Sequence, residues 1–585
     1  MFVFSDVRGM AHSCASLFWH FWETHSEFLH VELKILVITL TILYVSSHAT
    51  LHRPASAQPR KKGKTPSSYG DENEEDDEKP NNIGGLQPSD AIVFPIMASV
   101  ALVGMYYVIQ YLRKADLLNL VMRWYTSVVS VGSLVTLYSH GLQLATSFVF
   151  PRYWTANGRA IYRVNQATRR HHVWEQGKAV NDQDTVEMPL GPLPYAKAPF
   201  RLPASAQNFL WELRGLFTEK WILEIKVHGI LSEKMPLRFQ HGLAAFMAVM
   251  TILVYNLTNS ALLSNILGLA FCYATQQLLS PTKFVTGFLV LIGLFVYDIV
   301  MVFYTPFMIT VATKVDAPVK LTIQTGSKSN LLGLGDIVIP GIMVALALRF
   351  DLWMYYQRKV RYVAVDAKTE SSEEKKSDQL TQPTNPRRIA KRAQYTDVTG
   401  TWGDWFWTSR LAFPFRTSPQ PPEIVASSFP KPYFYASLLG YAMGMGFTMT
   451  MLMVFKHGQP ALLYLVPGLI GSLLLTGLVR GEIREMMIYN EDGSLDVEDA
   501  EVELDQNGRL LRIIEAKEEE KGKEKGDDKK DKSSGEERKE GETVKGSEVT
   551  EGHHEKKKQP DVLLIRISAP TIEAGDNARS KIHEE

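Results

Sequence analysis

Two aspartates, Asp298 and Asp336, lie inside long apolar runs of this 585-residue sequence. A carboxylate at membrane depth is costly, so such a residue is by default a candidate for function. Glu32, Asp116 and Asp351 fall at the ends of apolar runs, where their side chains can reach the membrane interface. Asp298 and Asp336 are therefore the residues to which we assign chemistry first.

The two aspartates are expected at the same depth. Asp298 precedes the end of its run at Phe303 by as many residues as Asp336 follows the start of its run at Leu331. Consecutive membrane segments are antiparallel, so a helical rise of about 1.5 Å per residue puts both carboxyl groups roughly 7–8 Å in from one face. Groups at one depth can share one water molecule.

A carboxyl pair of this kind can hydrolyse a peptide bond. Two neighbouring carboxyl groups cannot both ionise cheaply, so they share a proton and titrate as a pair. The ionised partner takes a proton from water, and the protonated partner polarises the scissile carbonyl. The resulting tetrahedral diol collapses as the amide nitrogen is protonated. This reaction requires no metal and no cofactor, and the residues leave open which aspartate holds the proton.

The aspartates must be positioned by membrane helices. About twenty apolar residues cross a bilayer, and the sequence contains nine such runs, which predicts an all-α polytopic membrane protein. The predicted segments are Val31–Ser46, Ala91–Leu112, Leu118–Leu142, Phe239–Leu257, Ala261–Leu279, Phe284–Phe303, Leu331–Leu348, Tyr433–Phe455 and Pro460–Val479. The two cysteines, Cys14 and Cys272, do not form a disulfide framework or a thiolate metal site.

The basic residues predict the orientation. Lys and Arg gather in the loops that follow the first, third and seventh segments, so these loops are expected in the cytosol. The N-terminus is then lumenal and the C-terminus cytosolic. The predicted division is a lumenal N-terminus (1–30), helices one to three with a charged cytosolic linker (31–142, linker 47–90), a cytosolic insertion (143–238), helices four to seven (239–350), a second insertion (351–432), helices eight and nine (433–480) and a disordered cytosolic tail (481–585).

Three polar stretches are interpreted as solvated linker or tail. They are the acidic run Asp71–Glu78, the charged stretch Ala367–Tyr395 and the region beyond Asn490, which is rich in Glu, Lys, Gly and Asp. Within that last region, Val562–Ile567 is a short apolar patch, for which a docking strand and no role at all both stay open.

Glycine and proline residues surround the candidate pair. Gly333 and Gly335 precede Asp336, and glycine permits close approach of a backbone or a substrate. Gly293 is expected to serve helix packing. Pro460 opens the ninth segment and Pro467 interrupts it, which frees a backbone carbonyl, although prolines at helix ends are ordinary.

At these positions the sequence resembles the signal peptide peptidase and presenilin clan. Phe295-Val296-Tyr297-Asp298, Gly333-Leu334-Gly335-Asp336 and Gln459-Pro460-Ala461-Leu462 look like the clan's YD, GxGD and PAL motifs. The resemblance is strong over residues 261–485 and extends more weakly to 90–142. It implies a presenilin-like fold with Asp298 and Asp336 as catalytic residues, supported by Tyr297, Gly333, Leu334 and Gly335. It further implies that Pro460, Ala461 and Leu462 bind substrate.

The resemblance to signal peptide peptidase also implies a setting and partners. Members cut signal peptides and type II membrane proteins inside the bilayer, in the endoplasmic reticulum. Implied partners are these membrane-spanning substrates and the lipid bilayer, with a homo-oligomer or a complex with the degradation machinery of the endoplasmic reticulum as a further possibility. Nucleic acid is not an expected partner. The long cytosolic insertions indicate a fungal-type member, and Lys581-Ile582-His583-Glu584-Glu585 resembles a retrieval signal.

Other interpretations use the same aspartates. A proton- or cation-coupled transporter also pairs membrane carboxylates, but it predicts inverted repeats, and the two halves show none. A non-catalytic membrane chaperone that binds client helices stays open as an additional role. A presenilin-like subunit fits the charge pattern and the residues after Leu462 less well. For a protease, we expect the substrate helix to unwind and pair as a strand with the loop before Gly333.

Overall fold

The computed structural model of the chain describes a membrane bundle and parts of its loops. The described residues are 29–58, 85–112, 115–156, 160–174, 185–186, 188–194, 200–219, 221–227, 231–314, 320–325, 328–364, 388–409, 420–455, 459–491, 501–504, 510–514 and 563–568. Residues 1–28, the acidic run Asp71–Glu78 and the segment Lys581–Glu585 lie outside them, so the predictions made for these stretches stay predictions.

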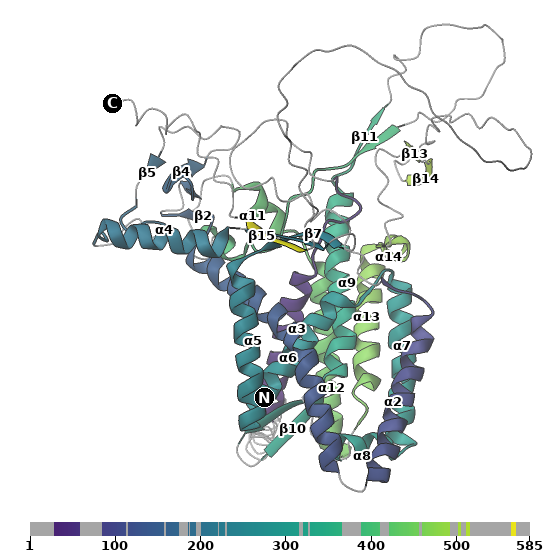
Figure 1. Cartoon of the computed structure of the whole chain (residues 1–585). Helices are drawn as coiled ribbons and strands as arrows, with labels where there is room; N and C mark the ends of the chain where they lie inside the picture. Colours follow the sequence, from purple (N-terminus) through teal and green to yellow (C-terminus); the bar gives the residue numbers. More distant parts are fainter. Residues whose placement is uncertain are drawn as a thin grey trace, which may run out of the picture.

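Long helices form the centre of the molecule (Figure 1). They are the N-terminal helix Leu29–Ala49, α2 (Asp90–Leu112), α3 (Ala115–Val149), α5 (Phe239–Thr258), α6 (Ala261–Leu278), α7 (Phe284–Phe303), α9 (Gly335–Gln357), α12 (Pro432–Phe455) and α13 (Leu462–Arg480). Within the part of the chain that the structure describes, 8 helices are long and apolar enough to cross a membrane. The expected all-α polytopic membrane fold is confirmed.

Helix α6 is the predicted fifth segment, and it is not among those eight. It has 18 residues and runs within the bundle, but polar side chains lower its apolarity. Gln276 is buried and its Oε1 accepts a hydrogen bond of 2.6 Å from the Ser46 hydroxyl of the N-terminal helix. Near the other end of α6, Asn265 bonds a neighbouring strand. The polar residues of α6 therefore hold it to the elements around it.

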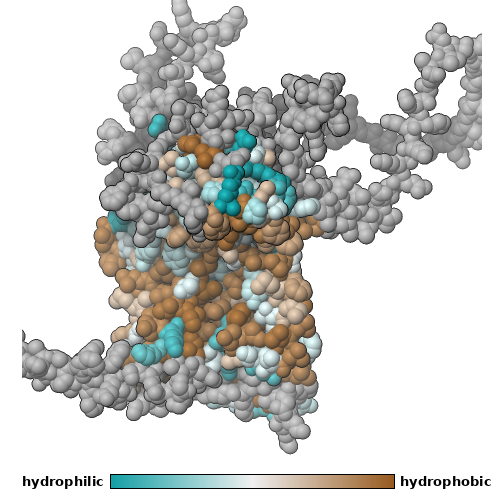
Figure 2. Space-filling view, turned by 90° about the vertical axis from the view of Figure 1, so that its left-hand side faces the viewer, coloured by the Kyte–Doolittle hydropathy of each residue, from teal (hydrophilic) through white to brown (hydrophobic). Residues whose placement is uncertain are grey.

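The outer surface of the bundle is apolar, as a bilayer requires. Tyr111, Leu257 and Val479 are 86%, 83% and 79% exposed. Figure 2 shows a broad hydrophobic band across one face of the bundle, below a cap with more hydrophilic residues. Helix α9 lies inside this band, because 89% of its most apolar stretch is buried, whereas the corresponding share of α2 is 6%. The helix that carries Asp336 is therefore the central one.

Helix α9 differs from its predicted bounds at both ends. The segment was expected at Leu331–Leu348, but Leu331–Gly333 belong to strand β10 (Lys328–Gly333), which pairs antiparallel with β9 (Lys320–Thr325). Leu332 and Leu321 are register partners and both are buried, so the hairpin has its own apolar anchor. At the other end the helix continues to Gln357. It includes the charged residues Arg349 and Asp351, which have buried partners.

Two glycines allow helices to approach closely. A Cβ atom at Gly293 of α7 would lie 2.7 Å from the Ala91 carbonyl of α2, so the expected role of Gly293 in packing is met at α2. A Cβ atom at Gly440 of α12 would lie 2.6 Å from the Gly468 carbonyl of α13. Small residues at such crossings let backbones pack without a gap.

A small folded unit covers one end of the bundle, which we call the insertion end. It contains the sheet β2 (Tyr153–Thr155), β3 (Ile161–Asn165), β4 (Arg170–Trp174) and β5 (Thr185–Val186), with helices α4 (Ala204–Thr218), α10 (Trp402–Thr408) and α11 (Pro422–Ser427). Helix α4 lies across the end of α5 in Figure 1. Trp154 and Trp211 are buried in the core of the folded unit. The Asp404 carboxylate of α10 accepts hydrogen bonds from the backbone N–H groups of Arg152 and Tyr153. Residues from the two predicted insertions thus pack together.

The described parts of the tail are also ordered. Helix α14 (Ile483–Ile488) follows α13. Strands β13 (Glu501–Leu504) and β14 (Leu510–Ile514) extend a sheet with β11 (Arg361–Ala364) and β12 (Arg388–Lys391). Strand β15 (Leu563–Ser568) pairs with β6 (Trp221–Val227), which also pairs with β7 (Leu231–Leu237). The expectation of a disordered tail does not hold for these residues. Within the apolar patch Val562–Ile567, the described residues Leu563–Ile567 form a paired strand, which was one of its two interpretations.

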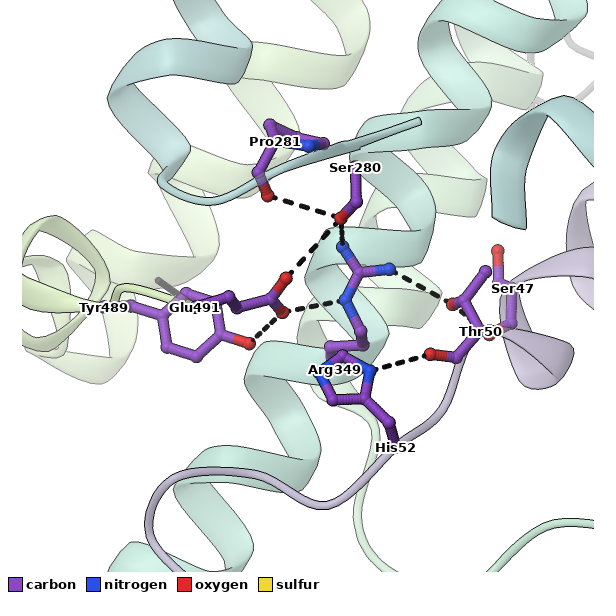
Figure 3. Close-up of polar contacts among 8 residues, drawn as sticks. All are labelled: Ser47, Thr50, His52, Ser280, Pro281, Arg349, Tyr489 and Glu491. Atoms are coloured by element: carbon purple, nitrogen blue, oxygen red, sulfur yellow. Dashed lines mark hydrogen bonds and ion pairs between the residues drawn. The ribbon is translucent and has the colours of Figure 1, made fainter. Parts of the chain in front are cut away.

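A buried polar cluster fixes α9 at the insertion end (Figure 3). The Arg349 guanidinium donates to Glu491 at 2.7 Å, to the Thr50 hydroxyl at 3.2 Å and to the Ser280 hydroxyl. Ser280 belongs to β8 (Ser280–Pro281), which pairs with β1 (Gly85–Leu86). Tyr489 donates its hydroxyl to Glu491, whose backbone N–H bonds the Thr282 carbonyl. One cluster thus joins α9, the N-terminal helix, the start of α7 and the chain after α14.

Candidate active site

Asp298 projects from α7 into the bundle. The apolar run Phe284–Phe303 forms the helix within its predicted bounds, and Asp298 is only 4% exposed. Its Oδ2 accepts a hydrogen bond of 3.1 Å from the backbone N–H of Leu462. This carboxyl group is therefore buried and has one fixed partner from a distant part of the chain.

That partner belongs to the Pro460-Ala461-Leu462 motif. Ala461 is the N-cap of α13, and the Pro460 and Ala461 carbonyls accept the N–H groups of Leu463 and Leu465. The N–H of Leu462 lies in the first turn, where no intrahelical acceptor exists. A carboxylate near a helix N-terminus is favoured by the free N–H groups and the helix dipole. The motif thus presents a backbone donor to Asp298, and Leu462 itself is buried.

Asp336 lies in the first turn of α9, one residue after the helix begins at Gly335. The prediction of matched depth rested on a helix that began at Leu331, and that helix start is wrong. The carboxyl group is half-buried, and the charge of Asp298 acts on it electrostatically. Among the described residues no hydrogen bond reaches the Asp336 carboxyl group; its backbone carbonyl accepts the Tyr441 hydroxyl of α12 at 3.4 Å.

The residues before Asp336 set the space around its carboxyl group. A Cβ atom at Gly333 would lie 3.3 Å from Asp336 Oδ2, tighter than ordinary packing, whereas one at Gly335 would meet only Ile339, at 3.9 Å. Leu334 is the N-cap residue of α9 and is 5% exposed. Gly333 therefore leaves room at the carboxyl group, and Leu334 anchors the turn in the core.

The structure brings together most of the predicted site residues. Asp298 contacts the Pro460-Ala461-Leu462 turn, and Gly333 adjoins the Asp336 carboxyl group. Tyr297 is half-buried and packs against the main apolar core. Sequence reasoning missed Tyr441 and the β9–β10 hairpin. The alternation of apolar and polar residues in Lys320–Thr325 was a signal for a strand; nothing local marks Tyr441.

Comparisons with known proteins point to one family. A family model described as signal peptide peptidase matches residues 76–493. The signal peptide peptidase of Homo sapiens is 32% identical over 250 residues, which cover 41% of this chain and 47% of the relative. The signal peptide peptidase of Mus musculus matches with the same figures. A probable intramembrane protease of Schizosaccharomyces pombe is 28% identical over 252 residues, which cover 43% of this chain and 63% of the relative.

The alignments span about half the length of the curated relatives. No solved structure gives a significant match to the chain. The family model, however, covers more than two thirds of the sequence and includes Asp298, Asp336 and Pro460-Ala461-Leu462. The chain belongs to the signal peptide peptidase family.

Proposed function

We propose that this protein is an intramembrane aspartic endopeptidase in which Asp298 and Asp336 form the catalytic pair. The observation that carries the proposal is the electrostatic interaction between these two carboxyl groups, from α7 and α9, inside a bundle with an apolar outer surface. Carboxyl groups so placed share a proton, as hydrolysis by an aspartate pair requires. The membership of the chain in a family of intramembrane proteases supports the same assignment.

The proposed mechanism uses one ionised and one protonated aspartate. The ionised carboxylate takes a proton from a water molecule between the two groups, and the protonated carboxyl donates a hydrogen bond to the scissile carbonyl. The Leu462 N–H holds Asp298 in place and compensates part of the cost of burying it. Because no hydrogen bond from the described residues reaches the Asp336 carboxyl group, that group is free to bond the substrate.

We propose membrane-spanning segments of signal peptides and of type II membrane proteins as substrates. A peptide bond in a helix is shielded, so the segment must unwind before water can attack it. Strand β10 ends at Gly333, next to the Asp336 carboxyl group, and offers an edge to which an extended segment can add. Helix-breaking residues near the cut site should then speed cleavage, and equal rates with and without them would contradict this part of the proposal.

The proposed setting is the membrane of the endoplasmic reticulum. The multi-pass bundle supports a membrane location, and the basic loops support a lumenal N-terminus and a cytosolic C-terminus. The insertion end is then cytosolic, and the β9–β10 end is lumenal. A homo-oligomer or a complex with the degradation machinery of this compartment is part of the same proposal.

The direct test uses purified protein in detergent with a synthetic type II membrane segment. Asp298→Ala and Asp336→Ala should each abolish cleavage, because each removes half of the pair. Asp90→Asn is the matched control, since Asp90 lies at the start of α2 and, among the described residues, its carboxylate accepts only the backbone N–H of Gln87. Cleavage by all three variants at the wild-type rate would end the protease proposal.

A further inference from the structure

One side chain of α6 bonds the outer edge of the β9–β10 hairpin. Asn265 of α6 donates its Nδ2 to the Thr322 carbonyl at 2.7 Å and accepts the Thr322 N–H with its Oδ1 at 2.9 Å. Both backbone groups of one residue are thus bonded, as a neighbouring strand would bond them. The amide of Asn265 therefore takes the place of a strand at the outer edge of β9.

This contact fixes which backbone groups of the hairpin face outward. In an antiparallel pair, the N–H and C=O of one residue point to the same side, and the side alternates along the strand. The backbone N–H and C=O of Thr322 bond Asn265, so these groups point away from β10. The backbone N–H and C=O of its register partner Leu331 must then point away from β9. Ser329, Leu331 and Gly333 then present their N–H and C=O groups along the outer edge of β10, which has no strand partner in the described part of the chain.

The open edge leads directly to the candidate catalytic group. Gly333 ends β10, Leu334 is the N-cap of α9, and Asp336 follows in the first helical turn. Leu321 and Leu332 anchor the hairpin in the core, being 1% and 8% exposed. Asn265 adds the polar attachment that sets the position of β9 along α6, and through the hairpin the position of the residues before Asp336.

On the β9 side of the hairpin, continuous strand pairing is blocked at Thr322, although space exists there. A groove of about 520 Å³ lies between the N-terminal helix and α6, lined by residues that include Leu33, Lys34, Leu262, Asn265 and Thr322. An extended peptide in this groove would find the Thr322 backbone groups already bonded. The groove therefore cannot offer the edge that β10 offers.

We propose that Asn265 is a positioning residue of the protease. It blocks the outer edge of β9 at Thr322, leaves the edge of β10 as the uninterrupted edge of the described hairpin for an extended substrate segment, and holds that edge in register with Asp336. This inference rests on the proposed function, and it adds that the substrate pairs with Ser329, Leu331 and Gly333.

The test compares four variants in proteoliposomes with a type II membrane segment, measuring kcat, KM and the masses of both products. Asn265→Leu removes the amide at similar size. Thr322→Pro removes the bonded N–H without touching the ladder, because that N–H points away from β10. Thr322→Val and Ser264→Ala are the matched controls: the first keeps the backbone contact, and the second alters the adjacent residue of α6, whose side chain makes no hydrogen bond among the described residues.

Asn265→Leu and Thr322→Pro should both lower kcat about tenfold with little change in KM, the effect of losing about 1.4 kcal/mol of hydrogen bonding that positions the edge. Both should also give products displaced by one or two residues, because the substrate can now pair in other registers. The two controls should match the wild type in rate and product mass.

Wild-type product masses from Asn265→Leu or Thr322→Pro would overturn the inference, whatever the change in thermal stability. So would the same displacement in Thr322→Val. The proposed function fails separately, since it requires that Asp298→Ala and Asp336→Ala be inactive. Inactive aspartate variants together with unshifted Asn265→Leu products would leave the protease assignment standing and remove only the role of Asn265.

Discussion

The two ends of α9 treat their charged residues in opposite ways. At the insertion end, the Arg349 guanidinium bonds Glu491, Thr50 and Ser280, and the Asp351 carboxylate accepts the N–H groups of Tyr433 and Phe434 at the start of α12. At the hairpin end, the Asp336 carboxyl group has no hydrogen bond from the described residues and lies within reach of the charge of Asp298.

The difference separates structural charges from reactive ones within one helix. A buried charge is stable only when its partners compensate for the lost water. Arg349 and Asp351 have such partners, so they hold helices together. Asp336 lacks such partners among the described residues, and the absence of a Cβ at Gly333 leaves room beside its carboxyl group, which suits a group that must bond a substrate. The stabilities of the Arg349–Glu491 pair and of the folded unit around His171 test the structural role of the insertion end, and the activity of a Gly333 variant tests the reactive role of the hairpin end.

The largest expected effect concerns the Arg349–Glu491 pair. Glu491→Gln leaves the Arg349 guanidinium buried, at 4% exposure, without its counter-charge. We expect a loss of about 3–5 kcal/mol of stability, measured by unfolding in mixed detergent micelles. Arg358→Gln is the control, because the Arg358–Glu482 pair is 46% exposed on the Arg side and should cost less than about 1 kcal/mol.

A double replacement separates the burial of charge from the packing of the cluster. Arg349→Met combined with Glu491→Leu removes both charges and should recover much of the loss. If Glu491→Gln is as mild as Arg358→Gln, the insertion end is not held by this pair, and the comparison between the two ends of α9 fails.

The second prediction concerns His171 in the folded unit at the insertion end. Its Nδ1 accepts the Trp154 indole N–H at 3.0 Å, and its Nε2–H donates to the Gly191 carbonyl at 2.9 Å, which is the bonding of a neutral imidazole. Burial lowers the pKa of His171 to about 4. Below about pH 6.5 the unfolded state binds more protons, so the stability of this unit should fall by about 2 kcal/mol between pH 6.5 and pH 5 and stay constant above that range.

Hydrogen exchange of strands β3 and β4 at pH 7 and pH 5 measures this directly. Protection should decrease at the lower pH in the wild type, and His171→Gln should remove most of the dependence. Equal protection of the wild type at both pH values would show that His171 does not control the stability of this unit.

The third prediction concerns Gly333 and is the smallest. Gly333→Ala places a Cβ atom 3.3 Å from Asp336 Oδ2 and should displace that carboxyl group by a few tenths of an ångström. We expect cleavage to slow about tenfold with little change in thermal stability, because misplaced reacting groups lose rate steeply. Gly335→Ala is the control, since its Cβ would make only ordinary contact, and alanine favours the helix by up to about 1 kcal/mol. Equal rates in both variants would remove the role given to Gly333.

The sequence predicts some of these elements well because their signals are local. Helix α7 has its predicted bounds because an uninterrupted apolar run extends from Phe284 to Phe303. The start of α9 was misplaced because Leu331 and Leu332 are as apolar as a helix start, and short apolar runs do not separate strand from helix. Only pairing with Lys320–Thr325 makes them a strand.

Other features depend on partners far along the chain. Asp351 was expected to reach a membrane interface, but it is buried against the start of α12, and Arg349 is buried against Glu491. Strand β15 exists through its pairing with β6, more than three hundred residues earlier. The Leu462–Asp298 bond is of the same kind: the motif marks both residues, and only the folded chain gives the contact.

The most direct test of the central claim measures cleavage and stability together for Asp298→Asn, Asp336→Asn and the double variant. Residues that act as a unit are not additive, so each single change should abolish cleavage and the double variant should lose nothing further. Asp336→Asn should unfold at or above the wild-type temperature, because it removes a carboxyl group beside a second one and breaks no hydrogen bond among the described residues. Cleavage that persists in either single variant, or a loss of activity that only parallels a loss of thermal stability, would contradict the account.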